Sequence, residues 1–378
     1  MSRVVLKFGG SSLANIERIQ HVARLVVQHA QNAQVIVVVS AMQGETDRLT
    51  QLAKSFQDLP VPCRELDQII ATGEVVSAAM LAMAIKAYGL KAQSMTGWQA
   101  KIKTTHVNQN ARFTEMDPSP LLTLLDQKII PIVTGFQGVA DDTVTTLGRG
   151  GSDLSAIILS DVFKADACWI YTDVKGVYAT DPNRCPNENI FAHLHYEQLQ
   201  SMAWFGAEVV QFAAAQHALK QQVHFRVCST FEPGEGTLVT HHQSARFPAI
   251  VQKSNISMLK WLVRPAKSKL EALSASCMLD TTDAMVINAP LHHVQYLIRQ
   301  IGVADNEYVL ETHKTLVSML YLTSSQMAVM RQANSVLGAY VVKEDSTGFH
   351  LITDDKAATA VVQQLVNELK LIDQPVVF

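Results

Sequence analysis

The chain has 378 residues, of which 48% are hydrophobic, so it is long enough and apolar enough to form two or three packed domains. It carries 31 lysine and arginine residues against 34 aspartate and glutamate residues, a formal net charge of -3, without a basic run or an acidic tail. This balance argues against a nucleic-acid partner.

The cysteines and the N-terminal residues indicate a reducing compartment. The five cysteines are odd in number and widely spaced, with no CxxC pair, so neither a disulfide framework nor a zinc site is expected. The chain enters a strand-like run without a charged leader, and no segment reaches the roughly 18 consecutive apolar residues of a membrane span. We therefore expect a cytoplasmic protein without a membrane partner.

The first elements along the chain predict a βαβ unit. VVLKF (residues 4–8) is a short β-branched run that stops at Gly9 and Gly10, as a strand followed by a tight turn does. Apolar residues then recur at helical spacing to about residue 31. VIVVVS (35–40) is a continuous apolar strand of the kind that parallel sheets bury on both faces.

The alternation of helices and strands continues to about residue 172. Helical stretches near 64–88 and from about 152 alternate with strand-like segments at 129–136 and 167–172. This order predicts an α/β domain with a largely parallel sheet and helices on both faces. Its active site is expected at the carboxyl ends of the strands, where the glycine-rich turns fall.

The sequence changes character at about residue 248. Short candidate strands (257–263, 284–289, 316–322, 339–344 and 348–353) alternate with helices around 265–275, 290–302, 324–336 and 356–370. The order is βαββαβ-like in two loosely similar halves, without a glycine-rich turn or clustered acids. It predicts a small-ligand or dimerisation module, and periodicity does not distinguish the two.

LKFGGSSLAN (6–15) has the components of a phosphate loop. Lys7 lies at a strand end, Gly9 and Gly10 expose backbone amides, and Ser11 precedes a helix, whose N-terminus carries partial positive charge. It is not a Walker A loop, in which the lysine follows the glycines. Taken alone, such a segment is more often a simple turn than a phosphate site.

TTLGRGGSDLSA (145–156) is a second glycine turn at a predicted strand-to-helix junction. Two such loops in one domain suit the opposite ends of a triphosphate, with Arg149 beside them. Asp153 at the helix start has two equally weighted interpretations, a helix cap or a functional carboxylate. YTDVKGVYATDP (171–182) is a surface hairpin when taken alone, but in a nucleotide-binding sheet it places Asp173 near the ribose hydroxyls.

Seven segments, in this order, resemble the aspartate kinases (aspartokinases), which are members of the amino acid kinase family. They are KFGGSS (7–12), VVVSAMQGETDRL (37–49), TGEVVSAAML (72–81), VTGFQG (133–138), TTLGRGGSD (145–153), YTDVKGVYATDP (171–182) and TFEPGEGTLV (230–239). The resemblance covers roughly residues 3–240. The downstream region resembles a diverged version of the paired ACT domains of that family.

The resemblance implies a fold and a reaction. The fold is a three-layer α/β sandwich with a largely parallel central sheet over 1–245, followed by a smaller α+β, ferredoxin-like ACT-like region over 246–378. The reaction transfers the γ-phosphoryl group of ATP to the side-chain carboxylate of L-aspartate, the entry step to lysine, threonine and methionine. Mg²⁺ is expected on the ATP phosphates without side-chain ligands.

The resemblance also implies roles for individual residues. Lys7 would bridge the β- and γ-phosphates, Arg149 would bind the substrate α-carboxylate, and Glu74 the α-ammonium. Asp153 would orient the phosphate loop or the amino end of the substrate. The phosphate loops would be Gly9, Gly10, Ser11, Gly150 and Gly151; the substrate pocket Thr46, Phe136 and Ser152; and the nucleoside site Thr172, Asp173, Tyr178 and Asp181.

Three departures from the family pattern bear on ATP binding. Asn183 stands where an arginine commonly follows the proline of TDP, Glu208 stands at a lysine position, and Gln211-Phe212 replaces His-Pro. An anion in place of a cation beside a triphosphate costs on the order of 1 kcal/mol. Weak ATP affinity is therefore expected unless Arg184 or Lys175 substitutes.

Two alternatives to an aspartate kinase stay open. One is a kinase of the same fold that acts on a different amino acid, and the other is an amino-acid sensor that has lost catalysis. The intact Lys7, Arg149 and Asp153 argue against the second. The C-terminal region lacks the clean pattern that accompanies lysine or threonine binding, so the effector is open, whereas a homodimer through this region is expected.

Overall fold

The computed structural model describes residues 2–56, 63–185, 189–241, 247–274, 276–289, 291–333, 340–344 and 348–369. The chain divides into two compact units. The first unit contains residues 1–177, 191–200 and 209–244, and the second contains 178–190, 201–208 and 245–378. Compactness differs from independent folding, so the domain division at 245/246 stays a prediction.

An eight-stranded sheet forms the centre of the first unit, in the order β10-β12-β11-β9-β1-β2-β6-β3. The strands are β1 (Ser2–Phe8), β2 (Ala33–Val39), β3 (Ala92–Met95), β6 (Ile130–Thr134), β9 (Ala167–Thr172), β10 (His193–His195), β11 (Phe225–Ser229) and β12 (Thr237–Thr240). The pairs from β11 to β3 are parallel, and β12 runs antiparallel to β11. The predicted, largely parallel α/β sheet is thus confirmed.

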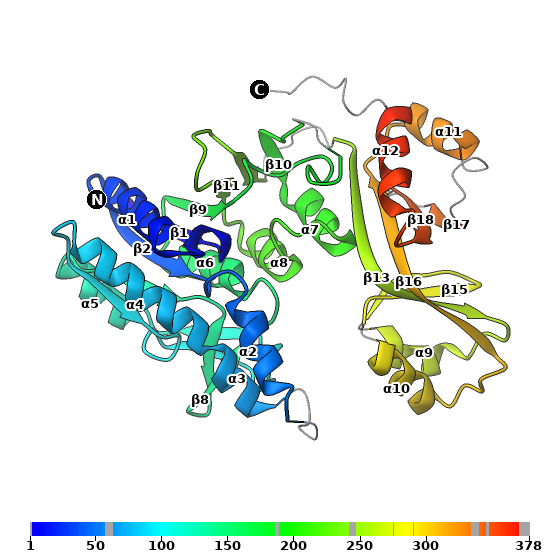
Figure 1. The fold of residues 1–378 in the computed structure, drawn as a ribbon, viewed down its shortest axis with the longest axis horizontal. Helices are drawn as coiled ribbons and strands as arrows, with labels where there is room; N and C mark the ends of the chain where they lie inside the picture. The colour runs from blue at the N-terminus through cyan, green and yellow to red at the C-terminus, as the bar shows by residue number, and fades with distance from the viewer. Residues whose placement is uncertain are drawn as a thin grey trace. The chain divides into compact units, whose positions relative to one another are not determined.

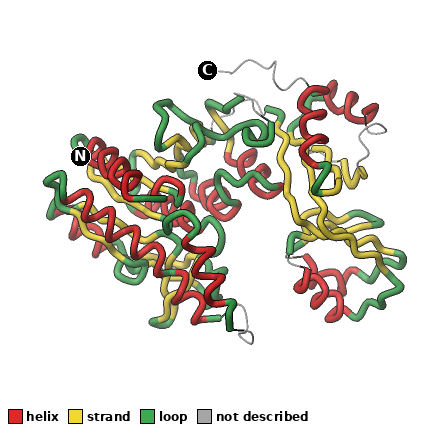
Figure 2. Tube along the Cα trace, viewed as in Figure 1, coloured by secondary structure: helices red, strands yellow, loops and turns green. Residues whose placement is uncertain are grey.

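Helices of the first unit cover both faces of this sheet (Figures 1 and 2). They are η1 (Ser11–Leu13), α1 (Ile16–Ala30), α2 (Glu45–Ala53), α3 (Arg64–Ile70), α4 (Thr72–Lys86), α5 (Ser119–Asp126), α6 (Gly151–Val162) and α8 (Phe212–Gln221), and α7 (Tyr196–Phe205) spans both units. α1 and α4 pack together with one face of β1 and β2 in a single apolar core. α6 packs against β1, β2 and β9 and carries α8 on its outer side.

The alternation of side chains along β1 decides where Lys7 lies. Val4, Leu6 and Phe8 belong to the core that β1 forms with α1 and α4. Because successive strand residues point to opposite faces, Val5 and Lys7 project to the other face, where α6 packs. Lys7, the second-last residue of this buried strand, therefore meets the first turn of α6.

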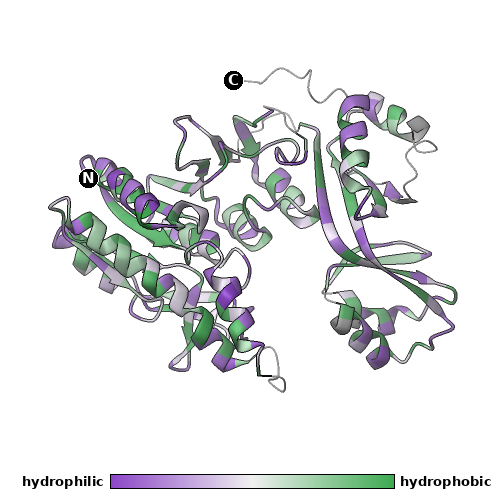
Figure 3. Cartoon of the chain, in the orientation of Figure 1, coloured by the Kyte–Doolittle hydropathy of each residue, from purple (hydrophilic) through white to green (hydrophobic). Residues whose placement is uncertain are grey.

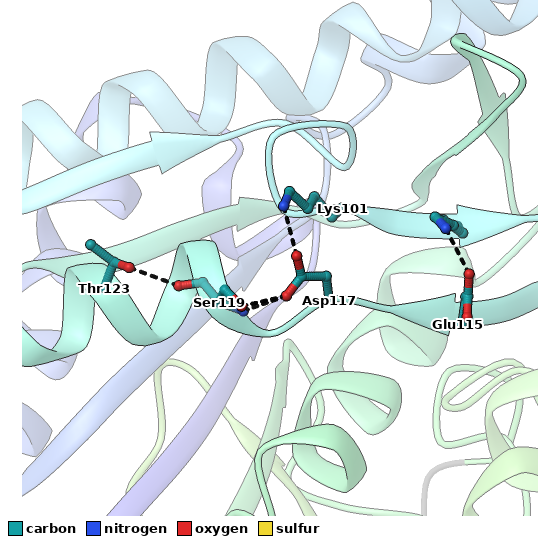
Figure 4. A network of polar contacts seen from close by, with 6 residues as sticks. Lys101, Glu115, Asp117, Ser119 and Thr123 are labelled. Atoms are coloured by element: carbon teal, nitrogen blue, oxygen red, sulfur yellow. Dashed lines mark hydrogen bonds and ion pairs between the residues drawn. The ribbon is translucent and has the colours of Figure 1, made fainter.

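A second, four-stranded sheet of the first unit was not predicted. It has the order β5-β4-β7-β8, from β4 (Ile102–Thr104), β5 (Phe113–Met116), β7 (Gln137–Ala140) and β8 (Thr143–Thr146). Figure 4 shows its polar surface: Lys101 Nζ lies 2.6 Å from Asp117, which also accepts hydrogen bonds from the backbone N–H and hydroxyl of Ser119 at the start of α5. These pairs are solvent-exposed and contribute little to stability.

The second unit has a six-stranded antiparallel sheet, in the order β14-β15-β13-β16-β18-β17. Its elements are β13 (Ala249–Trp261), α9 (Lys267–Ser274), β14 (Cys277–Asp280), β15 (Ala284–Ile287), α10 (Leu291–Ile301), β16 (Tyr308–Leu320), α11 (Ser324–Ala333), β17 (Tyr340–Glu344), β18 (Gly348–Asp354) and α12 (Ala358–Glu368). The first six elements are in βαββαβ order. The long strands β13 and β16 contribute to two separate apolar cores, one with α9 and α10 and one with α11 and α12, so the two predicted halves share one sheet.

One expectation about the sequence is corrected. The run 64–86, which α3 and α4 form, is long and apolar enough by length and composition to cross a membrane, and Figure 3 shows α4 largely in the hydrophobic colours. Half of its apolar 18-residue window is buried inside the protein, as in the core helix of a globular domain, so the run is weak evidence for a membrane span. The five cysteines are free thiols in this structure.

Candidate active site

Four strands of the main sheet end at one edge, and the segments that follow β1 and β9 begin with residues predicted for the site. β1 lies between β2 and β9 with both neighbours parallel to it, and β6 follows β2. The segments after these strands begin with Gly9, Ser40, Gly135 and Asp173. The predicted location at the carboxyl ends of the strands is therefore the place where these segments meet.

Lys7 and Asp153 form a buried ion pair at this edge. Lys7 Nζ lies 2.6 Å from Asp153 Oδ1, and the two side chains are 10% and 7% exposed. The N-cap residue of α6 is Gly150, and no side chain caps this helix, so the interpretation of Asp153 as a cap is wrong. A buried cation held by one carboxylate is poised to exchange that partner for a phosphate oxygen.

The two glycines after β1 hold the chain close to its neighbours. The N–H of Gly9 donates to the carbonyl of Tyr171 in β9 at 3.2 Å. A Cβ on Gly10 would lie 2.8 Å from the carbonyl oxygen of Ala41, closer than side chains pack. Ser11 is half-buried in the short helix η1, and its carbonyl accepts from Arg18, so the predicted phosphate loop is a tight turn against β2 and β9.

Glu74 is a buried carboxylate in the first turn of α4. Its Oε1 accepts a hydrogen bond from the N–H of Ala41 at 3.0 Å, whereas Oε2 is buried without a hydrogen-bond partner among the described residues. Burial raises the pKa of Glu74 to about 7, although its backbone hydrogen bonds act in the opposite direction. Ala41 contacts both Gly10 and Gly73, so Glu74 and the loop after β1 meet at this residue.

The loop between β8 and α6 is built on two left-handed glycines. Gly148 and Gly150 have φ values of 76° and 72°, which favour glycine, and Arg149 lies exposed between them. A Cβ on Gly150 would lie 2.0 Å from Cγ of Gln211, the residue that precedes α8. Gln211, which departs from the family pattern, therefore packs directly on the second glycine loop.

Phe136, Ser152 and Thr46 lie on elements that converge on this loop. Phe136 has a left-handed backbone (φ 67°), its N–H donates to Ser155 Oγ at 3.1 Å, and its ring is close to Gly151. It also packs on the apolar cluster between α2 and α3, where α2 carries the half-buried Thr46. Ser152 is buried and lies against Gly135.

The predicted nucleoside residues divide between the two units. Thr172 donates a hydrogen bond to Asp173 at 3.1 Å, and both belong to the first unit. Tyr178 and Asp181 belong to the second unit, where Asp181 accepts from the N–H of Asn183 at 2.9 Å. The role of these four residues stays a prediction.

Glu208, which departs from the family pattern, and the two cations suggested to compensate for it all have ion-pair partners. Glu208 lies 3.7 Å from Lys253, and Arg184 lies 3.5 Å from Asp181, both within the second unit. Lys175 lies 3.1 Å from Glu232. The expected weak ATP affinity stays a prediction, and the two proposed substitutes for the missing cation are each engaged with a carboxylate.

Several residues that support the site have no signal in the sequence. Ser12 and Thr230 are buried and bonded to each other at 2.6 Å, and Asp67 accepts from three donors, one of them 79 residues away. Only a contact map reveals such pairs. In the part of the chain that the structure describes, no group of three or more histidine, cysteine, aspartate or glutamate side chains is arranged for a metal ion.

Comparison with known proteins agrees with this geometry. The family model described as the amino acid kinase family matches residues 2–229, which include the whole edge described above as far as Ser229. The chain belongs to the amino acid kinase family. The predicted family is therefore confirmed.

Curated members of the amino acid kinase family include close relatives of this chain. The aspartate kinase of Pseudomonas putida is 44% identical over 242 residues, which are 64% of this chain and 59% of that protein. Aspartokinase 2 of Bacillus subtilis is 42% identical over 254 residues, which are 67% and 62% of the two chains. The match thus spans about three fifths of the length of these relatives.

Solved structures of this family share the fold over nearly the whole chain. Aspartokinase III of E. coli in complex with aspartate and ADP (R-state) has a TM-score of 0.80 at 22% identity, covering 98% of this chain and 100% of that one. The same enzyme with lysine and aspartate (T-state) has a TM-score of 0.70 at 22% identity, with 97% and 99% coverage. Both units therefore follow a known arrangement of secondary structure.

Proposed function

We propose that the protein is an ATP-dependent aspartate kinase that phosphorylates the side-chain carboxylate of L-aspartate. The observation that carries the proposal is the edge of the main sheet, where a buried lysine of β1 pairs with Asp153 and the loop after that strand meets Ala41, which is bonded to a buried glutamate. One oxygen of this glutamate has no hydrogen-bond partner among the residues that the structure describes. The ammonium of Lys7 suits a phosphate, and the carboxylate of Glu74 suits an ammonium. A substrate that carries both an ammonium and an acceptor carboxylate next to ATP is an amino acid.

The relatives support aspartate as that amino acid. Proteins that are 42 to 44% identical over 242 to 254 residues are named aspartate kinase or aspartokinase, and the E. coli enzyme with a similar fold is described in complex with aspartate. Arg149 in the loop before α6 is proposed to bind the α-carboxylate, because guanidinium geometry matches a carboxylate with two parallel hydrogen bonds.

The chemistry needs positioning more than proton transfer. The side-chain carboxylate of aspartate has a reference pKa of about 3.9, so the nucleophile is already ionised at neutral pH and no general base is required. Lys7 then neutralises charge on the transferring phosphoryl group after it leaves Asp153, and the loop amides at Gly10 and Gly150 hold the phosphates. The amide of Gly9, which was also predicted for this role, donates instead to the carbonyl of Tyr171. Asp153 keeps Lys7 in place before ATP arrives.

The nucleotide and its metal are also part of the proposal. The E. coli relative is described in complex with ADP, which supports nucleotide use. Mg²⁺ would be carried on the phosphates and would neutralise their charge. The acidic side chain that pairs with Lys7 at this place is Asp153. Thr172 and Asp173, at the end of β9, would face the ribose, while the predicted nucleoside role of Tyr178 and Asp181, which belong to the second unit, stays a prediction.

The second unit is proposed to be a pair of ACT-like halves that dimerises the chain in the cytoplasm. Its βαββαβ order and shared sheet support this assignment. The E. coli relative is described in complex with lysine, so lysine or threonine is a candidate effector here. The pathway would be the synthesis of lysine, threonine and methionine.

The test is ATP-dependent formation of aspartyl hydroxamate with a panel of amino acids, with and without lysine and threonine. We expect turnover on aspartate that disappears in Lys7→Ala, while the control Lys103→Ala, in the exposed pair with Glu115, keeps full activity. Turnover on a different amino acid, and not on aspartate, would show that aspartate is not the substrate. Ligand binding without turnover on any amino acid would favour a sensor.

A further inference from the structure

Asp67 is a fully buried carboxylate that the proposed chemistry does not use. It lies in α3 with no exposed surface, and no ion pair includes it among the residues that the structure describes. Its oxygens accept hydrogen bonds from Asn108 Nδ2 at 2.7 Å, the N–H of Gln109 at 3.2 Å and Thr146 Oγ1 at 2.5 Å. A buried carboxylate satisfied only by neutral donors holds those donors in one arrangement.

Two of these donors lead directly into the loop that carries Arg149. Thr146 is the last residue of β8, three positions before Arg149, and its carbonyl accepts from the N–H of Ala111. The carbonyl oxygen of Gln109 would lie 3.0 Å from a Cβ on Gly148, so this segment forms one wall of the loop. Asp67 thus fixes both the strand that enters the Arg149 loop and the segment that the loop rests on.

The backbone of Asp67 is joined to the helix that carries Glu74. The carbonyl of Asp67 accepts from the N–H of Ala71, where α3 ends, and Glu74 follows in the first turn of α4. The carbonyl of Ala71 in turn accepts from Gln137 Nε2 at 2.5 Å. The side chain of Gln109 bonds Cys63 in both directions, which anchors the start of α3 to the same segment.

We propose that Asp67 is a positioning residue that fixes the Arg149 loop relative to the Glu74 helix and so sets recognition of the substrate α-carboxylate. The inference rests on the proposed function, in which Arg149 binds the α-carboxylate and Glu74 the α-ammonium. Asparagine at this position has one acceptor oxygen, and its NH₂ group faces the N–H of Gln109, so at least one hydrogen bond is lost. The loop then shifts while Glu74 stays on its helix.

Two analogues of aspartate separate this effect from a general loss of structure. Succinate keeps both carboxylates and lacks the ammonium, whereas β-alanine keeps the ammonium and lacks the α-carboxylate. In calorimetric titrations with ADP and Mg²⁺ present, we expect Asp67→Asn to weaken the binding of succinate about tenfold and to change the affinity for β-alanine less than twofold. The affinity for ADP, titrated separately, should also change less than twofold. Thr146→Val should also weaken the binding of succinate, whereas Thr146→Ser, which keeps the hydroxyl, should bind succinate as the wild type does.

The outcomes are distinct. Equal weakening of succinate, β-alanine and ADP, or an unchanged affinity for succinate, would overturn the inference; so would full additivity of Asp67→Asn with Arg149→Ala. If Asp67→Asn does not fold, Thr146→Val decides by the same ratio of affinities. A wild-type protein without turnover on aspartate would refute the proposed function, whereas the succinate to β-alanine ratio would still decide the role of Asp67.

Discussion

The Lys7 and Asp153 pair joins stability to catalysis at the scale of single residues. Both side chains are at most 10% exposed, so the removal of one leaves a buried charge without its partner. We expect Lys7→Met to lower the free energy of unfolding by about 3 to 5 kcal/mol and to abolish turnover. The double variant Lys7→Met with Asp153→Asn should recover most of the stability and none of the activity.

Urea unfolding and the hydroxamate assay measure these two quantities on the same preparations. The matched control is Lys101→Met, which breaks the exposed pair with Asp117 in Figure 4 and should leave stability and turnover unchanged. Equal losses of stability in the single and double variants would show that packing, and not the unpaired charge, determines the effect.

Glu74 predicts a pH dependence of substrate capture. Burial raises its pKa to about 7, so below that pH the carboxyl is largely protonated and cannot pair with the substrate ammonium. We therefore expect kcat/KM for aspartate to rise with pH, from about a tenth of its plateau one unit below the pKa to the full value above it. The profile is measured from pH 5.5 to 8.5 at saturating ATP.

Glu74→Gln supplies the control for this profile. Its amide keeps an oxygen for the N–H of Ala41 and does not titrate, so the variant should show low activity without the step near pH 7. A step that persists in the variant would assign the titration to another group.

At the scale of single residues the sequence predicted Lys7, Glu74 and Asp153, but the ion pair and the role of Ala41 emerged only from the fold.

Elements with a strong local pattern were predicted well, and elements without one were missed. β1, β2, β6 and β9 are short continuous apolar runs next to glycine or polar turns, and each was expected within a few residues. The sheet of β4, β5, β7 and β8 was missed because its strands are three or four residues long and mix threonine, lysine and glutamate with few apolar residues. Its pairing is non-local and therefore absent from any sequence window.

The contact between the glycine loop and α8 gives a prediction at the scale of elements. A Cβ on Gly150 meets Gln211 at 2.0 Å, and Gly150 also has a left-handed backbone. We expect Gly150→Ala to destabilise the protein through both overlap and strain. Because Cβ of Gln211 also lies 2.2 Å from the new Cβ, the overlap is relieved only in a Gln211→Gly background, where the remaining penalty should be about 1 to 2 kcal/mol.

Thermal and urea unfolding of the four variants in this cycle give the coupling between the two positions. A matched control is Gly89→Ala, where φ is also positive (82°) and no atom lies within 4 Å of the new Cβ, so only strain is added. A coupling near zero between Gly150 and Gln211 would show that the start of α8 moves away without cost, and that Gln211 has no influence on the loop.

The organisation of the whole molecule follows from two separate sets of cores. The first unit has its main core between β1, β2, α1 and α4, and the second has one core at each end of its shared strands β13 and β16. The change in sequence texture near residue 248 predicted this division. It did not predict that 178–190 and 201–208 pack with the second unit, because those segments have no pattern that marks where they pack.

Self-association through the second unit is the prediction that belongs to this scale. Leu262 and Val263, just after β13, are 65% and 59% exposed, and a dimer through this unit would cover such an apolar pair. Burial of two such side chains contributes roughly 3 kcal/mol, so Leu262→Glu with Val263→Glu should weaken the dimer about a hundredfold. Sedimentation over a range of concentrations measures this, with Val75→Glu plus Val76→Glu on α4 as the control, an exposed apolar pair of the first unit. A wild-type protein that sediments as a monomer throughout, or a dimer weakened only by the α4 changes, would place association elsewhere.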